Sequence, residues 1–185
     1  MTFDFKNGSK TDLKLEYNRI AKEIGDDQFF TKKELNHLPK ILAEGEQILA
    51  FTSGLMNGNT WLITLTDRRI IFLDKGMIFG LKQTTIDLDK VNSVSGTIGL
   101  IFGVIKIEDG AAQREIRNVW KKSVVKFTNK VSDAIEKRKA LSRSSHSSNE
   151  SEDDVISKIE RLASLFEKGL INEMEFIKQK QKLLS

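Results

Sequence analysis

The first forty residues have the hydrophobic spacing of helices. Four apolar residues recur at steps of four, three and four positions and so share one helix face: Leu13, Tyr17, Ile20 and Ile24. Gly25 is a residue type that commonly ends a helix. Thr31 and Glu34 have the spacing of a capping box and predict a short second helix. We expect that helix to stop near Leu38, because the residue before Pro39 disfavours the helical conformation.

From Glu46 onward the pattern changes to short runs of β-branched and aromatic residues. The runs are separated by turn-forming pairs such as Asn57-Gly58 and Asp109-Gly110. They predict seven strands, at 47–53, 59–66, 69–75, 81–87, 91–95, 103–108 and 113–118. Short strands at this spacing are typical of an antiparallel sandwich or a small barrel.

One amphipathic helix is predicted after the strands, over 119–139, with Asn118 as its N-cap. Its apolar stripe consists of Trp120, Val124, Phe127, Val131 and Ala134 with Ile135. Four lysines fall on the opposite face: Lys122, Lys126, Lys130 and Lys137. The sequence therefore predicts a helix that closes the strand domain and presents a basic face.

The end of the chain predicts a linker and a helical hairpin. Residues 142–151 contain six serines, which is linker composition. Asp153 or Asp154 is placed to cap a helix that Gly169 should end, and Asn172 should cap the next helix. The apolar residues of the two helices are Val155, Ile159, Leu162, Phe166, Phe176, Ile177, Leu183 and Leu184.

The composition of the chain excludes several classes of functional site but does not identify a function. The 185 residues carry a net charge of +4 and no cysteine, which excludes disulfide frameworks, thiolate zinc sites and cysteine nucleophiles. The two histidines, His37 and His146, fall in a short helix and in the linker, and no nucleophile with a neighbouring base is suggested. We expect no enzyme, no metal and no cofactor. The run 98–105 is too short to span a bilayer and no signal peptide is visible, so we expect a cytoplasmic protein.

Two segments carry a resemblance to the bacterial pleckstrin-homology (PH) domain. Residues 61–73, WLITLTDRRIIFL, resemble its strand-TDRR-strand hairpin, and residues 86–94, IDLDKVNSV, resemble a following segment. The lead-in over 30–35, with Leu38-Pro39 and Gly45-Glu46, is similar to the YokE-like subgroup. The resemblance implies a PH-like domain over 30–141. Residues 1–29 match no family and form an N-terminal helical extension.

The tail resembles the short C-terminal (SHOCT) domain over 155–184. The matching residues are Ile159 to Leu162, Lys168 to Asn172, Glu175-Phe176 and Lys182 to Leu184, with Asn172 where the family favours Thr or Ser. This resemblance implies an oligomerisation or interaction module. The expected fold is α+β: a seven-stranded antiparallel sandwich or barrel capped by a helix, a linker at 142–152 and a separate helical hairpin at 153–185.

The tail gives the strongest functional argument. A domain below about 40 residues rarely encloses a sufficient core without a cross-link or oligomerisation. Four apolar residues should therefore bury against another copy, against the chain's own PH-like domain or against a different protein: Leu162, Phe166, Phe176 and Leu183. We predict a homo-oligomer whose PH-like domain binds a protein partner.

Other ligands are weighed against this hypothesis. The loop 53–59 has no basic residue and Arg68 and Arg69 supply only two charges, so we do not expect phosphoinositide recognition. Residues 119–143 carry eight basic and two acidic residues, a net +6. That lysine face is a candidate for an anionic membrane or, in a phage- or prophage-associated regulatory or host-interaction protein, for nucleic acid, and otherwise is simply a solvated surface.

Overall fold

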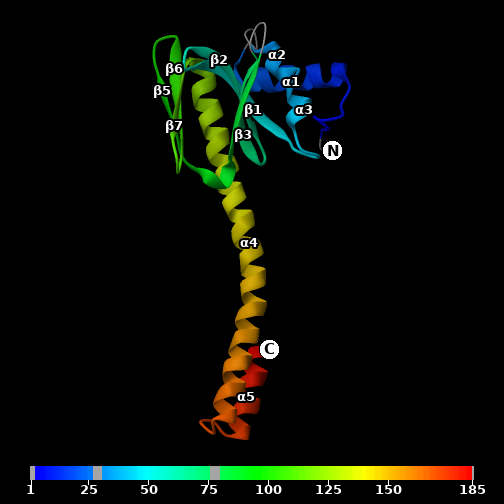
Figure 1. Cartoon of the computed structure of the whole chain (residues 1–185), viewed down its shortest axis with the longest axis vertical. Coiled ribbons are helices and arrows are strands. Elements are labelled where there is room, and N and C mark those ends of the chain that lie inside the picture. The colour runs from blue at the N-terminus through cyan, green and yellow to red at the C-terminus, as the bar shows by residue number, and fades with distance from the viewer. Residues whose placement is uncertain (1–2, 27–30, 76–79, 185) are drawn as a thin grey trace. The chain divides into compact units, whose positions relative to one another are not determined.

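The computed structural model describes residues 3–26, 31–75 and 80–184 (Figure 1). The chain divides into two compact units, residues 1–138 and 139–185. Each is described by itself below.

The first unit is built on one seven-stranded antiparallel sheet with the strand order β4-β3-β2-β1-β7-β6-β5. Its strands are β1 (Ile48–Met56), β2 (Asn59–Thr66), β3 (Arg69–Lys75), β4 (Leu81–Asp87), β5 (Val91–Ile98), β6 (Phe102–Asp109) and β7 (Gln113–Trp120). All seven predicted strands are confirmed, and a 3-10 turn, η1 (Leu88–Lys90), separates β4 from β5. The predicted α+β fold with a seven-stranded antiparallel sheet is therefore confirmed.

The sheet consists of two halves, β1–β4 and β5–β7, that meet along β1 and β7. The pairing between these two strands is limited to Leu55 and Arg117. Gly54 lies at the junction, where an added Cβ would be 2.4 Å from Ile116 Cγ2 and 2.7 Å from the Arg117 carbonyl oxygen. The halves also face each other, because the Arg114 guanidinium of β7 lies 5.6 Å from the ring centre of Phe72 in β3.

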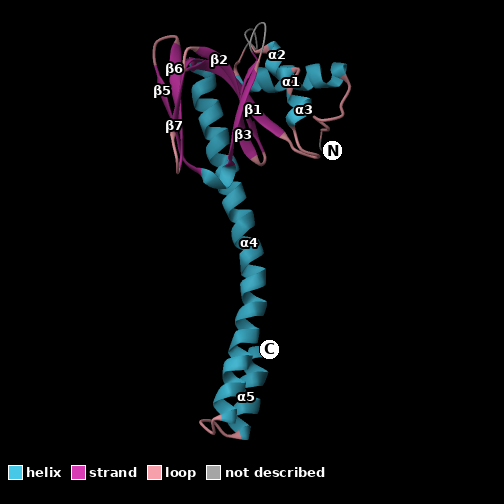
Figure 2. Cartoon of the chain, in the orientation of Figure 1, coloured by secondary structure: helices cyan, strands magenta, loops and turns pink. Residues whose placement is uncertain are grey.

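Helix α4 (Lys121–Glu167) begins beside the β5–β7 half (Figure 2). Val124, Phe127 and Val131 are fully buried, so the predicted apolar stripe is confirmed at these positions. Gly96 and Gly103 leave the space that Val124 occupies, since a Cβ on either would come within 2.8 Å of its methyl groups. These glycines serve close packing of the helix.

The predicted start of this helix at Val119 is wrong. Val119 and Trp120 belong to β7, where they pair with Gly103 and Phe102 of β6. Asn118 is no helix cap, because it has a left-handed φ of 54° inside the strand. β-branched and aromatic residues favour strands, and here the partner strand extends far enough to hold them.

The serine-rich segment differs from the expectation as well. The structure assigns helix throughout α4, including the predicted linker at 142–152, and no new helix begins at Asp153 or Asp154. Serine costs only about half a kcal/mol per residue in a helix, and the segment contains no Gly or Pro to interrupt it. The division into domains at this segment stays a prediction.

Three helices precede the sheet: α1 (Lys10–Ile24), α2 (Lys32–Leu35) and α3 (Leu38–Ile41). Helix α1 buries its predicted stripe and ends at Gly25, whose φ is 88°. The expected capping box does not form, because Thr31 makes no side-chain cap. Pro39 stands in the first turn of α3, where its missing N–H costs nothing, so the second predicted helix divides into two short ones.

The N-terminal helices form a layer over the β1–β3 part of the sheet. Tyr17 of α1 packs edge-on against Phe51 of β1, with ring centres 6.2 Å apart. After α1, the Asp26 carboxylate accepts hydrogen bonds from the Thr52 hydroxyl at 3.2 Å and from the Ser53 amide at 3.0 Å. Helix α2 contacts β3. The N-terminal segment is thus part of the first unit.

The second unit contains the end of α4 and helix α5 (Glu173–Leu184). Gly169, with a φ of 69°, lies between them, as predicted. Asn172 and Glu175 form the reciprocal bonds of a capping box, each side chain accepting from the other's amide at 2.9 Å. Phe166 and Phe176 stack with ring centres 5.1 Å apart. The predicted hairpin is confirmed in its turn and in its second helix.

Candidate interaction surfaces

The four predicted tail residues lie on the hairpin and none of them is buried. Phe166 is 41% exposed, and the other three, Leu162, Phe176 and Leu183, are half-buried. The stacked pair Phe166–Phe176 brings the two helices together. Over 157–183, no side chain of this unit is buried. The hairpin therefore holds its helices side by side without enclosing a core.

The predicted basic face of α4 is partly covered by α1. Lys126 Nζ donates to the Glu23 carbonyl oxygen at 2.7 Å, and Lys130 forms an ion pair with the Glu23 carboxylate. The hydrogen bond from Lys130 holds the pKa of Glu23 below its ordinary value. Lys122 and Lys137 are exposed. Sequence reasoning missed this cover because Glu23 lies about a hundred positions before the lysines.

The arginines of the TDRR hairpin are occupied by structural contacts. Arg69 binds the carboxylate of Glu46 with two nitrogens, at 2.8 and 2.9 Å, and also donates to the Ile41 carbonyl oxygen. The Thr66 hydroxyl donates to the same carboxylate at 2.8 Å. Burial acts to raise the pKa of Glu46, but hydrogen bonds from Arg69 and the Ala43 amide outweigh it and hold that pKa below its ordinary value.

The neighbouring Arg68 donates to the Glu44 carbonyl oxygen at 2.9 Å. Asp67 accepts from the Gln47 amide, also at 2.9 Å. These contacts fasten the loop before β1 to the β2–β3 turn. The hairpin therefore has a structural role.

An exposed apolar surface surrounds the β5–β6 turn, and the sequence did not single it out. We call it the apolar tip; it consists of the exposed residues Ile98, Leu100, Ile101 and Phe102 and the half-buried Trp120. Leu100 is 90% exposed and Ile101 is 57% exposed. Phe102 and Trp120 lie against each other, with ring centres 4.7 Å apart. From the sequence, we considered the run 98–105 only for its length, which is too short to span a bilayer.

A cavity of about 590 Å³ lies beside the apolar tip. Leu100, Ile101 and Trp120 form part of its wall, and three lysines border it: Lys22, Lys121 and Lys122. All three lysine side chains are exposed. Apolar surface next to positive charge is a combination that suits binding to a protein or to an anionic surface.

Residue types that can hold a metal ion do not form a cluster in the part of the chain that the structure describes. There, no three His, Asp or Glu side chains gather where they could hold a metal ion. His37 is half-buried before α3, and the side chain of His146 lies outside the described ones. Within the same limits, the structure contains no helix with the length and hydropathy needed to cross a membrane.

Comparisons with known proteins identify the sheet domain. The chain is similar to a pleckstrin-homology protein of Shewanella loihica, with 14% identity, 56% of this chain and 94% of that chain covered, and a TM-score of 0.41. It is also similar to a pleckstrin-homology domain of Shewanella amazonensis, with 15% identity, 56% and 96% coverage, and a TM-score of 0.42. No curated protein sequence is significantly similar to the chain. The family model described as the bacterial PH domain matches residues 42–133, so this part of the chain is a bacterial PH domain.

Proposed function

We propose that the protein is a non-enzymatic adaptor that self-associates through its C-terminal hairpin and binds a protein partner with its PH domain. The observation that carries the proposal is the hairpin: its apolar residues recur at helical spacing, yet none of its described side chains is buried. Helix α5 has 12 residues, and a helix of that length is marginal in water unless its apolar face is covered.

A second copy of the hairpin is the occupant that its charges favour. Helix α5 has acidic residues in its first turn, Glu173 and Glu175, and basic residues in its second half, Lys178, Lys180 and Lys182. In an antiparallel, two-fold symmetric pair, each acidic end lies opposite the partner's basic end. The resemblance of residues 155–184 to the SHOCT domain supports the same role, and the YokE-like lead-in supports a bacterial adaptor of that subgroup.

The apolar tip is the surface we assign to the protein partner. It combines highly exposed aliphatic side chains with the pair formed by Phe102 and Trp120. Tryptophan and other large aromatic residues often supply most of the binding energy of an interface. The opposite half of the PH sheet is already covered by the N-terminal helices.

A second function, peripheral binding to an anionic membrane, is favoured by the three lysines beside the tip. Apolar side chains at a tip and adjacent lysines bind such surfaces together, by burial and by attraction to lipid charge. The site would consist of Lys22, Lys121 and Lys122, because Lys126 and Lys130 of the predicted basic face are engaged by Glu23.

Mass measurement by light scattering after size exclusion tests self-association. We expect the full chain to form a multimer and the variants Leu162→Asp and Phe176→Asp to be monomeric, because an ionised carboxylate is costly in a buried contact. Gln181→Asp is the matched control, since Gln181 is an exposed residue of the same helix. A monomeric full chain at all concentrations contradicts the proposal, and so does a chain ending at Ser145 that keeps the full multimer.

Flotation with vesicles separates the two kinds of partner. Vesicles with and without phosphatidylglycerol are mixed with the full chain at low and high salt. Salt-sensitive flotation that requires the anionic lipid supports the membrane function and contradicts the assignment of the tip to a protein partner. Absence of flotation leaves the protein partner as the function that the tip supports.

A further inference from the structure

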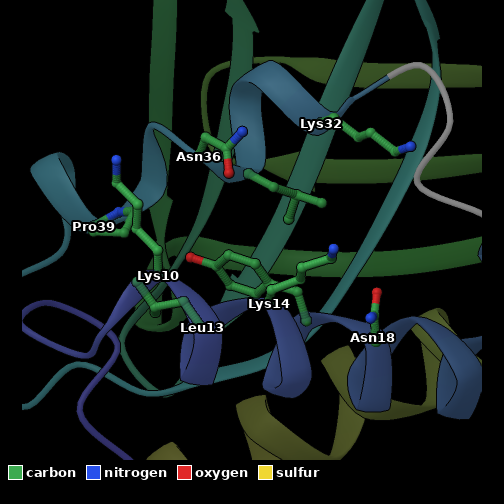
Figure 3. A pocket seen from close by; sticks show the side chains of 9 residues that line it. Lys10, Leu13, Lys14, Asn18, Lys32, Asn36 and Pro39 are labelled. Carbon is green, nitrogen blue, oxygen red and sulfur yellow. The ribbon is translucent and has the colours of Figure 1, made fainter.

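A cavity of about 640 Å³ lies between helix α1 and the segment of α2 and α3. Figure 3 shows Lys10, Lys14 and Asn18 on the α1 side and Lys32 and Asn36 on the opposite side. Its volume is in the range of roughly 300–1,000 Å³ that is usual for sites that bind small molecules. Its lining residues are not those of the apolar tip or of the hairpin.

The cavity has a strongly positive lining. Lys10, Lys14 and Lys32 line it, and among the residues that the structure describes no Asp or Glu does. Within the described parts of the chain, no ion pair of these three amines is present. Lys10 and Lys14 are four positions apart on one helix, where like charges repel. Their arrangement therefore does not stabilise α1 and instead favours an anion that lies between them.

Tyr17 is one of the residues that line this cavity. Its side chain is only 5% exposed, and its hydroxyl oxygen is buried with no hydrogen-bond partner among the residues that the structure describes. Its ring is held between Phe5 and Phe51, at centre distances of 6.3 and 6.2 Å. Burial raises the pKa of Tyr17 far above its ordinary value, so the hydroxyl keeps its proton at neutral pH. A buried polar group without a partner is costly, and an oxygen atom of a ligand would satisfy it.

The remaining wall is apolar. Leu13, Leu35 and Pro39 line the cavity next to the ring of Tyr17. An inorganic ion would leave this surface in contact with water. The lining thus matches a molecule that has a charged end and an apolar body.

We propose that this cavity binds a small organic anion, a phosphate monoester or a carboxylate on an apolar body. The lysines Lys10, Lys14 and Lys32 bind the charged end, and the Tyr17 hydroxyl donates a hydrogen bond to one of its oxygens. Bonds between an ionised donor and an ionised acceptor are the strong ones, and a phosphate offers several acceptors to several lysines.

Calorimetric titration of the full chain in phosphate-free, low-salt buffer tests the proposal with four probes: phenyl phosphate, benzoate, inorganic phosphate and phenol. We expect phenyl phosphate to bind most tightly, by roughly tenfold over inorganic phosphate, because its ring is removed from water. Benzoate should bind more weakly than phenyl phosphate, and phenol should not bind measurably. Equal affinity for inorganic phosphate and phenyl phosphate overturns the assignment of the apolar body and identifies a free ion as the ligand.

Three variants locate the binding. Lys14→Gln and Lys32→Gln should each weaken phenyl phosphate binding by roughly three- to tenfold, since each removes one charge-assisted bond. Tyr17→Phe should weaken it as well, while the melting temperature stays equal or rises, because the unpartnered hydroxyl is removed. Lys33→Gln is the control, since Lys33 is an exposed residue of α2 outside the cavity.

Absence of heat with all four probes overturns the proposal, and so does binding that the lysine and tyrosine variants leave unchanged. A melting temperature that falls in Tyr17→Phe without any change in affinity shows a structural role alone and also overturns it. These measurements do not depend on the multimer mass or on flotation, so their failure is distinguishable from failure of the proposed adaptor function.

Discussion

The two halves of the PH sheet differ sharply in how they are covered. In β3, the four consecutive residues Ile70 to Leu73 are fully buried, whereas in β5 only Val91 is buried. A strand that is apolar at every position must have both faces covered. For β3, one face meets the interior of the domain and the other lies under the N-terminal helices. Among the described residues, no N-terminal helix covers the β5–β7 half, which ends in the apolar tip.

This difference indicates which surface of the PH domain is available to a partner. The N-terminal segment adds a layer to one half, and the lysine-lined cavity lies in that layer. The other half keeps an apolar surface of the kind that marks interaction sites, since exposed aliphatic and aromatic residues gather there. Four changes, in order of decreasing effect on stability, test this comparison.

The largest effect is expected at Phe72 in β3. Phe72→Ala should lower the free energy of unfolding by about 3–5 kcal/mol, because it leaves a large cavity between well-packed layers. The same change at Phe102, which is 41% exposed, should cost only about 1 kcal/mol, mainly from the lost contact with Trp120. Urea unfolding of both variants measures the two values. Similar losses at the two positions contradict the difference between the halves.

A smaller effect on stability is expected from the ion pair between Glu46, in the loop before β1, and Arg69. Glu46→Gln should lower the free energy of unfolding by about 2–3 kcal/mol at pH 7, because it removes charge-assisted hydrogen bonds between Arg69 and the buried Glu46 carboxylate. The folded-state pKa of Glu46 is lowered, so its stabilising contribution is complete above the ordinary value of 4.5 and is lost as pH falls through the folded-state value.

Urea unfolding of the wild type and of Glu46→Gln between pH 7 and pH 3 measures this dependence. The difference in the free energy of unfolding between the two proteins should become smaller below pH 4.5, the ordinary pKa of a glutamate. Glu44→Gln is the control, because the Glu44 side chain is exposed and makes only surface contacts, to Lys6 at 3.8 Å and to Asn7 at 3.2 Å. A constant difference at all pH values contradicts the role of the Glu46 charge.

A substitution at Gly54 tests how closely β1 and β7 pack at the junction between the halves. Gly54→Ala should cost about 1–3 kcal/mol, because its Cβ would lie 2.7 Å from the Arg117 carbonyl oxygen, a backbone atom that is held in β7. Gly110→Ala is the matched control, since a Cβ there meets nothing within 4 Å and the position has no left-handed backbone. Equal stability of the two variants in urea unfolding shows that the strands separate easily at this point.

Local patterns predicted the elements of this protein well because each one depends on neighbouring residues. The stripe of α1, its end at Gly25 and the capping box of Asn172 and Glu175 are all encoded within a few positions. The start of α4 was misplaced because the strand preference of Val119 and Trp120 is satisfied by β6, a separate strand. A pattern of local spacing contains no information about such a partner.

The candidate sites depended more on contacts between distant residues. The pairs Glu46–Arg69 and Glu23–Lys130 join segments far apart in the chain, and they changed the role of residues that read as free charges. The lysines of the cavity come from two different helices, α1 and α2. The incomplete burial of the hairpin residues follows from length alone, because a segment so short cannot enclose a core. Their role as an oligomer or partner surface stays a prediction.

The smallest effect on stability is expected at the apolar tip. Leu100→Ser should change the free energy of unfolding by less than about 0.5 kcal/mol, because the side chain is 90% exposed and has little packing to lose. The same variant should elute earlier from a hydrophobic-interaction column, since Leu100 forms much of the exposed apolar surface. If Leu100→Ser lowered the free energy of unfolding as much as Gly54→Ala does, Leu100 would be packed in solution. The two halves of the sheet would then not differ in the apolar surface that they expose for binding.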